Sequence, residues 1–317
     1  YTLTGGTHTL DVTQRVLSST GGRAYNATTT ASASDQTLSG LQGGETLTLG
    51  GSGTVASANV GTGKTITLGS LALSNGTGTA SNYTLTGGTH TLDVTQRVLS
   101  STGSRQYDAT TTAANADQTL SGLQGGETLT LGGSGTVASA NVGTGKTITL
   151  GSLALSNGTG TASNYTLTGG THTLDVTQRV LSSTGSRQYD ATTTAANADQ
   201  TLSGLQGGET LTLGGSGTVA SANVGTGKTI TLGSLALSNG TGTASNYTLT
   251  GGTHTLDVTQ RVLSSTGSRQ YDATTDAAAS DITLSGLQGG ETLTLGGTGS
   301  ISSANVASNY AVTLGSL

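Results

Sequence analysis

The side chains with the widest capacity for chemistry are four histidines, each in the segment Gly-Gly-Thr-His-Thr-Leu: His8, His90, His172 and His254. An imidazole can ligate a metal ion where other ligands converge on it, or act as a base between a nucleophile and an orienting acid. The nearest acid to His90 is Asp93, and residues three apart along a strand point to opposite faces. We therefore expect solvated strand histidines with no part in catalysis or metal binding.

Acidic side chains are the second candidate group. Asp108, Asp117 and Glu127 could collect a calcium ion, but the sequence contains no DxDxD loop of the calcium-binding kind. The chain also has no cysteine, which excludes thiol catalysis, thiolate metal sites and disulfides. The sequence therefore predicts no metal centre.

A third candidate is the segment Gly61-Thr-Gly-Lys-Thr65, which resembles the end of a phosphate-binding P-loop. The leading glycine of that motif would fall at Ala58, and Lys64 is followed by a strand-like Thr-Ile-Thr-Leu rather than by a helix. Lys64 could instead crosslink to Asn59 or Asn82, as lysines do in some surface adhesins, but that reaction needs a buried acid. We predict exposed lysines in glycine-rich turns, here and at the two equivalent positions, Lys146 and Lys228.

No group of residues supports catalysis, so we predict a protein that is not an enzyme and that uses no cofactor. The chain carries a net charge of −5, and its 11 basic residues stand singly. Nucleic acids and anionic lipids bind to clustered basic residues, so neither is an expected partner. No apolar run is long enough to cross a membrane, and membrane insertion is not expected either.

These residues recur because the chain repeats itself. The segment that runs from Tyr83 to Ser100 also begins at Tyr1, Tyr165 and Tyr247, a spacing of 82 residues. A fixed period of this size is typical of tandem arrays. Leucine and valine alternate with polar residues along the segment, which indicates a strand with one buried face. Because no proline or glycine pair follows, we expect the last strand of one repeat to pass directly into the first strand of the next.

The period divides the chain into a short segment and four repeats, of which the second and third are identical at every position. The predicted boundaries are residues 1–13, the closing strand of a preceding repeat; 14–95, repeat 1; 96–177, repeat 2; 178–259, repeat 3; and 260–317, an incomplete repeat 4. Repeat 4 lacks the closing strand that residues 1–13 supply. We favour the explanation that this sequence is part of a longer covalent array, in which the missing strand follows in the same polypeptide. The alternative is head-to-tail strand donation between separate chains.

Strand-like segments separated by glycine-rich turns fill each repeat. In repeat 2 the predicted strands are 97–100, 118–123, 127–131, 135–139, 146–150, 153–155 and 165–177, and residues 113–116 could form at most one helical turn. The predicted core is Val98, Leu99, Tyr107, Leu120, Leu123, Leu129, Leu131, Val137, Val142, Ile148, Leu150, Leu153, Leu155, Tyr165, Leu167, Leu174 and Val176. We therefore expect an all-β rod of tandem small domains joined strand to strand. The alternative is a right-handed parallel β-solenoid with coils of about 20 residues.

Tyrosines and their neighbours are the residues to which we assign a structural role. The chain contains no Phe or Trp, so tyrosine must supply the largest core side chains, and a buried tyrosine hydroxyl needs a hydrogen-bond partner. The predicted structural motif residues are Tyr25, Tyr83, Tyr107, Asp108, Tyr165, Tyr189, Asp190, Tyr247, Tyr271 and Asp272.

Three spaced motifs carry a resemblance to a known family: Tyr107-Asp-Ala-Thr-Thr, Asn141-Val-Gly-Thr-Gly-Lys-Thr and Ser163-Asn-Tyr-Thr-Leu. In this order and spacing they resemble the YDG repeat and related glycine-rich, mostly-β repeats of filamentous-haemagglutinin-like, two-partner-secreted bacterial adhesins. The family has glycine where this chain has Ala109, so we expect a different turn there if that glycine has a positive φ.

The resemblance implies a non-catalytic, extracellular role on the bacterial surface or in a secreted filament. The expected function is a stalk or fibre in cell adhesion or biofilm matrix, with other copies or neighbouring repeats as partners. The alternative is an array of carbohydrate-binding β-modules whose partner is an extracellular polysaccharide. Sugar sites favour exposed aromatic platforms, and the absence of tryptophan counts against this alternative.

Overall fold

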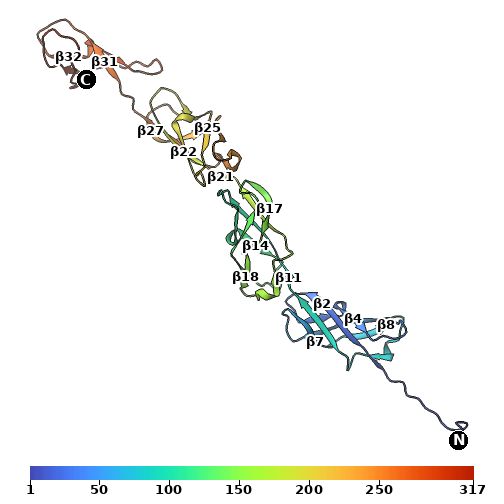
Figure 1. Cartoon of the computed structure of the whole chain (residues 1–317). Coiled ribbons are helices and arrows are strands. Elements are labelled where there is room, and N and C mark those ends of the chain that lie inside the picture. The colour runs from blue at the N-terminus through green and yellow to red at the C-terminus, as the bar shows by residue number, and fades with distance from the viewer. The chain divides into compact units, whose positions relative to one another are not determined.

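The computed structural model describes residues 1–317 and is built from short strands, with three-residue 3-10 turns as its only helical elements (Figure 1). The same set of strands recurs in repeats 1 to 3, which confirms the predicted all-β tandem domains. The chain forms two compact units, one of Tyr1–Arg105 with Thr110–Thr177 and the other of Gln106–Ala109 with Gln178–Leu317. None of its helices has the length and apolar character needed to cross a membrane.

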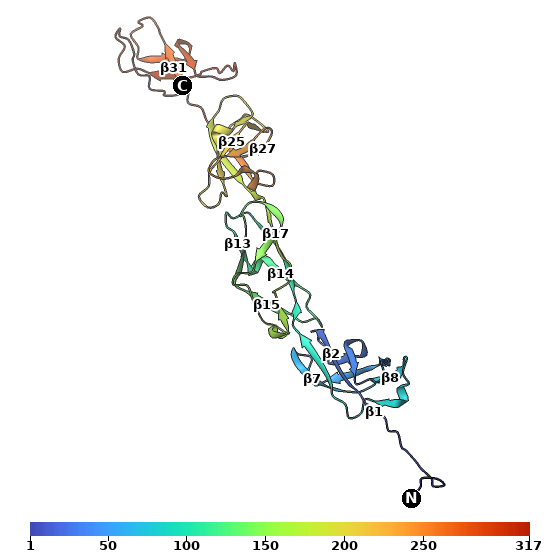
Figure 2. The same ribbon diagram turned by 45° about the vertical axis from the view of Figure 1, so that its right-hand side comes forward.

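The elements of repeats 1 and 2 follow one another in the same order along the chain, and Figure 2 labels several of them. In repeat 1 they are β1 (Arg15–Val16), β2 (Ser18–Ala24), β3 (Thr30–Ser32), η1 (Ala33–Asp35), β4 (Gln36–Ser39), β5 (Leu47–Gly50), β6 (Ser52–Val55), β7 (Gly61–Thr67), β8 (Ala72–Asn75), η2 (Ala80–Asn82), β9 (Tyr83–Thr84) and β10 (His90–Thr95). In repeat 2 they are β11 (Arg97–Val98), β12 (Ser100–Gln106), β13 (Thr112–Ala114), η3 (Asn115–Asp117), β14 (Gln118–Ser121), β15 (Leu129–Gly132), β16 (Ser134–Val137), β17 (Gly143–Thr149), β18 (Ala154–Asn157), η4 (Ala162–Asn164), β19 (Tyr165–Thr166) and β20 (His172–Thr177).

Repeat 3 follows the same order, whereas repeat 4 has fewer strands. In repeat 3 the elements are β21 (Arg179–Val180), β22 (Ser182–Gln188), β23 (Thr194–Ala196), η5 (Asn197–Asp199), β24 (Gln200–Ser203), β25 (Leu211–Gly214), β26 (Ser216–Val219), β27 (Gly225–Thr231), β28 (Ala236–Asn239), η6 (Ala244–Asn246), β29 (Tyr247–Thr248) and β30 (His254–Thr259). In repeat 4 they are β31 (Ser264–Gly267), β32 (Asp276–Ala278), η7 (Ala279–Asp281), β33 (Ile282–Ser285) and β34 (Thr298–Ser300).

Each complete repeat closes on itself through its last strand. In repeat 1 a six-stranded sheet has the order β3-β6-β7-β10-β2-β4, and two small sheets pair β5 with β8 and β1 with β9. The last strand, β10, lies between β7, to which it is antiparallel, and β2, to which it is parallel. Because most neighbouring strands are antiparallel and belong to one repeat, the chain forms domains rather than the coils of a solenoid.

The closing strand also carries the centre of the core. Leu92 is fully buried and Val94 is 2 % exposed, while Asp93 and Thr95 face solvent, as the alternation predicts. After Thr95 a single residue, Gln96, precedes β11, so one repeat does continue into the next strand to strand.

Several predicted strands differ from those observed. The strand predicted over 165–177 divides into β19 and β20, because Gly169 adopts a φ of 88° and a Cβ at Gly170 would lie only 1.9 Å from the Leu99 carbonyl. The long strand β12 was not predicted beyond Ser100, since its Ser-Ser-Thr-Gly-Ser-Arg-Gln sequence lacks apolar residues. No strand was predicted at β13, and the single helical turn allowed at residues 113–116 begins only at Asn115.

Other members of the predicted core were placed wrongly. Val98 is 46 % exposed, because its neighbour Leu99 occupies the buried face of the chain at that point. Leu120, Leu123, Leu129, Val142, Leu150 and Leu155 are only partly buried. Lys64 lies within β7 rather than in a turn, and it is half-buried rather than exposed.

The burial of β10 makes a direct prediction about stability. Val94→Asp should destabilise repeat 1 by several kcal/mol, because it places an unpaired carboxylate on a buried face. Thr95→Asp is the matched control and should change the unfolding free energy little, since Thr95 faces solvent. Chemical denaturation of the two variants checks this, and equal tolerance of both substitutions would contradict the observed facing of β10.

Candidate functional site: the contact between consecutive repeats

A carboxylate shared by two tyrosines joins repeats 1 and 2. The Tyr25 hydroxyl donates to Glu127 Oε1 at 2.6 Å, and the Tyr165 hydroxyl donates to Glu127 Oε2 at 2.6 Å. The two rings meet edge to face, with centroids 5.2 Å apart and planes at 76°. Tyr25 belongs to repeat 1 and the other two residues to repeat 2, so the cluster ties the repeats together.

Local backbone structure holds each member in place. Tyr25 follows β2, and its amide donates to the carbonyl of Thr95 at the end of the closing strand at 2.9 Å. Tyr165 opens β19 directly after η4. Glu127 follows a turn in which Gly125 and Gly126 have φ values of 59° and 71°, conformations that favour glycine.

Asn164 provides a second connection beside the tyrosines. Its side-chain oxygen accepts from the Val60 amide at 2.9 Å, and its side-chain nitrogen donates to Asn59 Oδ1 at 2.9 Å. Asn164 is 1 % exposed, whereas its equivalent in repeat 1, Asn82, is exposed. The residue is therefore buried by the repeat that precedes it, and its burial reports contact between repeats.

The same cluster recurs in the second unit. Tyr107 and Tyr247 both donate to Glu209 at 2.6 Å, and their rings again meet edge to face at 5.2 Å. In repeat 1 the equivalent Glu45 accepts at 2.5 Å from Tyr83 of its own repeat.

In repeat 4 the position equivalent to Glu209 is Glu291, which accepts from Tyr189. Tyr271, the equivalent of Tyr189, is 64 % exposed. Tyr25 and Tyr107 are buried, whereas Tyr189 is half-buried.

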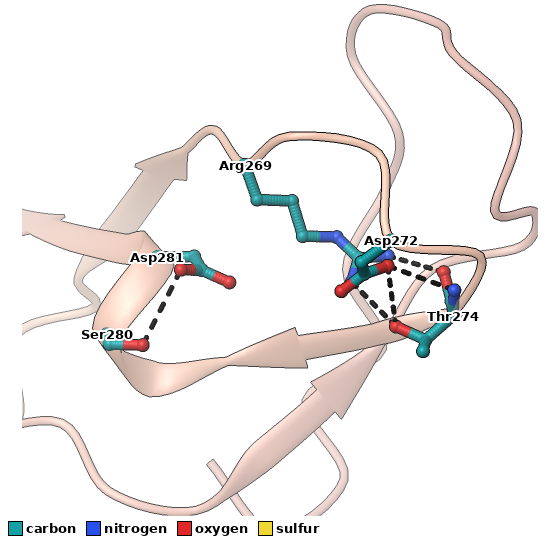
Figure 3. Close-up of polar contacts among 5 residues, drawn as sticks. All are labelled: Arg269, Asp272, Thr274, Ser280 and Asp281. Carbon is teal, nitrogen blue, oxygen red and sulfur yellow. Dashed lines mark hydrogen bonds and ion pairs between the residues drawn. The ribbon is translucent and has the colours of Figure 1, made fainter.

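The residues after the motif tyrosine form a compact polar turn (Figure 3). In repeat 4 the Arg269 guanidinium lies 2.7 Å from an Asp272 carboxylate oxygen and donates to the Thr274 carbonyl at 2.5 Å. The Thr274 amide donates to Asp272 at 2.9 Å. Hydrogen bonds from the Thr274 amide and hydroxyl lower the pKa of Asp272 below its ordinary value. Burial has a smaller opposite effect on this pKa, and the charge of Arg269 lowers it further.

The equivalent turns keep this arrangement with one substitution. In repeat 3 the same ion pair joins Arg187 to Asp190. In repeat 1 Asn26 replaces the aspartate, and its side-chain oxygen accepts from the Thr28 amide at 3.1 Å. An amide oxygen can therefore serve as the turn acceptor, so the turn does not depend on the negative charge.

Alanine occupies the left-handed position of this turn in all four repeats. Ala27, Ala109, Ala191 and Ala273 have φ values of 61° to 63°, so alanine itself adopts the left-handed conformation. That conformation costs an alanine roughly 1–2 kcal/mol. The Ala27 methyl lies beside Gly125 of repeat 2, and a Cβ added to Gly125 would lie only 2.9 Å from that methyl. Contact with the next repeat therefore accompanies the strain.

The prediction of solvated histidines is wrong for His90, His172 and His254, which are buried, whereas His8 is exposed. His90 is 4 % exposed, because it shares the face of Leu92 and Val94 on β10. Its Nδ1 is 2.9 Å from the Ser19 hydroxyl, and its Nε2 is 2.9 Å from the Leu85 carbonyl. Ser19 is fully buried, so this serine–histidine pair cannot reach a substrate and serves to join β10 to β2. The sequence does carry a signal for this burial: His90 stands two residues before Leu92, so on a strand the two side chains share the buried face.

The remaining candidate residues do not converge. Glu127 accepts hydrogen bonds from two tyrosines, and Asp117 lies in η3. Nowhere in the 317 residues do three His, Asp or Glu side chains lie close enough together to bind a metal ion. Lys64 donates to the backbone carbonyl of Asn59 at 2.5 Å rather than facing its side-chain amide.

Comparison with known families matches the YDG domain model to four segments, residues 10–92, 91–174, 172–256 and 253–317. The chain belongs to the YDG domain family. No curated protein and no solved structure matches it. The motif tyrosine of this YDG array is therefore the residue that reaches the glutamate of the following repeat.

Removing the shared carboxylate should loosen one YDG repeat from the next. Glu127→Ala removes the acceptor of two buried hydroxyls, and we expect a loss of about 1.5–3 kcal/mol for each charge-assisted bond that is not replaced by water. Glu45→Ala is the matched control and should lose less, because Glu45 accepts from Tyr83 alone among the motif tyrosines. Urea denaturation of both variants checks this, and equal losses would contradict a linking role for Glu127.

The tyrosine pKa values predict loss of stability in alkali. Burial and the hydrogen bonds to Glu127 and Glu209 raise the pKa of Tyr25 and Tyr107 from 10.0 to about 12. A group whose pKa is higher in the folded state stabilises that state below its unfolded pKa, and this contribution disappears as pH rises. Melting temperature should therefore fall between about pH 10 and 12, and less steeply in a Tyr25→Phe, Tyr107→Phe variant. An unchanged slope would contradict this origin.

Proposed function

We propose that this YDG array is a non-catalytic structural region of an extracellular bacterial adhesin or filament. In this role the repeats form a spacer, and each repeat is fastened to the next by the tyrosine–glutamate cluster. The observation that carries the proposal is the identical use of Tyr25 with Glu127 and of Tyr107 with Glu209. A chain whose repeats are joined through partly buried hydrogen bonds resists separation of those repeats, as a stalk or fibre under tension requires.

Composition supports the same role. Only 9 % of residues are charged, and the chain has no Cys, Met or Trp, the side chains that oxidants attack most readily. This composition suits a protein that persists outside the cell. Tandem arrays in which each repeat contacts its neighbours set a length through repeat number, which fits a spacer.

A carbohydrate-binding array receives less support. Five of the motif tyrosines are at most 6 % exposed, so their ring faces are not free to stack on sugars. These are Tyr25, Tyr83, Tyr107, Tyr165 and Tyr247. A glycan array probed with the full chain distinguishes the two roles, because only the carbohydrate-binding role predicts bound glycans. Glycan binding that persists in a Tyr271→Ala variant would require a binding site that does not include Tyr271.

Single-molecule force measurement tests the spacer role directly. Stretching the full chain should give unfolding events of equal length for the three complete repeats, each releasing 82 residues, or roughly 270–300 Å of extended chain less its folded span. The Glu127→Ala variant should lower the force of one event. Extension without discrete events would show that the repeats do not bear load, and would overturn the proposal.

A further inference from the structure

The two tyrosine–glutamate clusters are also the two places in the chain where aromatic rings meet. Tyr25 contacts Tyr165, and Tyr107 contacts Tyr247, with ring centroids 5.2 Å apart in each pair and ring planes at 76° and 77°. The two hydroxyls of each pair donate to a single glutamate carboxylate. The structure therefore places two phenols and one shared base together, twice.

The amino-acid composition directs oxidation to tyrosine. The chain contains no Cys, Met or Trp, the side chains that oxidants attack most readily. Its nine tyrosines are then the side chains that lose an electron most readily. A one-electron oxidant that attacks this protein is therefore expected to produce a tyrosyl radical.

The shared carboxylate makes this oxidation easier at the clusters. A phenol gives up its proton together with its electron, because an oxidised phenol that keeps its proton is a very strong acid. Burial and the hydrogen bond to Glu127 raise the pKa of Tyr25 to about 12, so this phenol is protonated at neutral pH and needs a base. Glu127 Oε1, at 2.6 Å from the Tyr25 hydroxyl, is in place to accept the proton.

The two rings of a pair are also placed for the coupling that follows oxidation. Tyrosyl radicals join through the ring carbons next to the carbon that carries the hydroxyl. Tyr25 and Tyr165 direct their hydroxyls to the two oxygens of one carboxylate, so these ring carbons lie on neighbouring edges. A centroid separation of 5.2 Å is direct ring contact. The rings can therefore couple after a small approach, without separation of the repeats.

We propose that each tyrosine pair is a site of oxidative crosslinking, at which a one-electron oxidant joins consecutive repeats through dityrosine. Two electrons pass one at a time to the oxidant, and the two phenol protons pass through Glu127, which is partly exposed, to water. A carbon–carbon bond forms between the rings, and the hydrogens of the two joined carbons are replaced by hydrogens on the two oxygens. The product has two hydrogen atoms fewer than the two tyrosines.

The crosslink replaces a hydrogen-bonded contact between repeats by a covalent bond. Residues 25–165 become a closed loop, and so do residues 107–247, where Glu209 is the base. Both loops survive denaturation of the repeats. The inference is independent of the spacer role, because reactivity toward an oxidant and resistance to force are separate properties.

Photo-oxidation of the full chain tests the proposal. The probe is tris(bipyridyl)ruthenium with persulfate, because it removes single electrons without contact with a buried ring, and persulfate takes up the two electrons as two sulfates. Dilute protein is oxidised, and the single-chain band from a denaturing gel is digested with trypsin. The Tyr25 peptide, residues 24–64, occurs once in the sequence. Mass spectrometry should find it joined to the Tyr165 peptide, with the loss of two hydrogen atoms.

Two phenylalanine variants identify the partner of Tyr25. They are needed because tryptic peptides of one sequence carry three of the tyrosines: residues 65–97, 147–179 and 229–261. Tyr165→Phe should abolish the crosslink to the Tyr25 peptide. Tyr247→Phe, the equivalent change in the other cluster, is the matched control and should retain it. An equal yield from both variants, or no Tyr25 crosslink within single chains of the unaltered protein, would overturn the proposal.

The glutamate is tested through the rate of crosslinking. Glu127→Gln keeps the shape of the side chain but removes the base, and a thermal melt checks that the variant is folded. A positioned base commonly speeds proton transfer by about 10²-fold, so Tyr25 crosslinking should slow by about tenfold or more. The Tyr107 crosslink, which uses Glu209, provides the reference rate in the same molecule. An unchanged ratio of the two rates would overturn the proposed path of the proton.

Discussion

The structure depends on a partly buried carboxylate that two tyrosines share. A carboxylate in an apolar setting is costly unless donors satisfy it, and two phenol hydroxyls at 2.6 Å satisfy Glu127 while they satisfy themselves. One donor comes from its own repeat and one from the repeat before. The cluster is therefore complete only when two repeats meet, which makes the stability of each repeat depend partly on its neighbour.

The closing strand extends this dependence through the chain. β10 lies beside β2, and it leads through one residue into β11 of the next repeat. The Tyr25 amide is bonded to the last residue of the same strand. Closure of one repeat therefore positions both the motif tyrosine and the start of the next repeat, and no flexible linker separates these events.

A polar chain with little aromatic content can fold in this way because the core is small and repeated. Aromatic residues make up 3 % of the chain, and all nine are tyrosines. Leucine and valine on the closing strands fill the interior, and the tyrosines cover it between repeats. In tandem arrays the free energy of unfolding comes partly from each repeat and partly from the contacts between neighbouring repeats, so an isolated repeat is only marginally stable.

The sequence by itself determined the period, the all-β class and the buried face of β10, because these follow from local alternation and spacing. It did not reveal β12, since a strand of Ser, Thr and Gly carries no apolar signal and is held by β14 and the closing strand. The tertiary structure alone decided that Glu127 faces Tyr25, 102 residues away, and that His90 is sealed against Ser19. Such contacts depend on how distant segments meet in space, and no local pattern records that meeting.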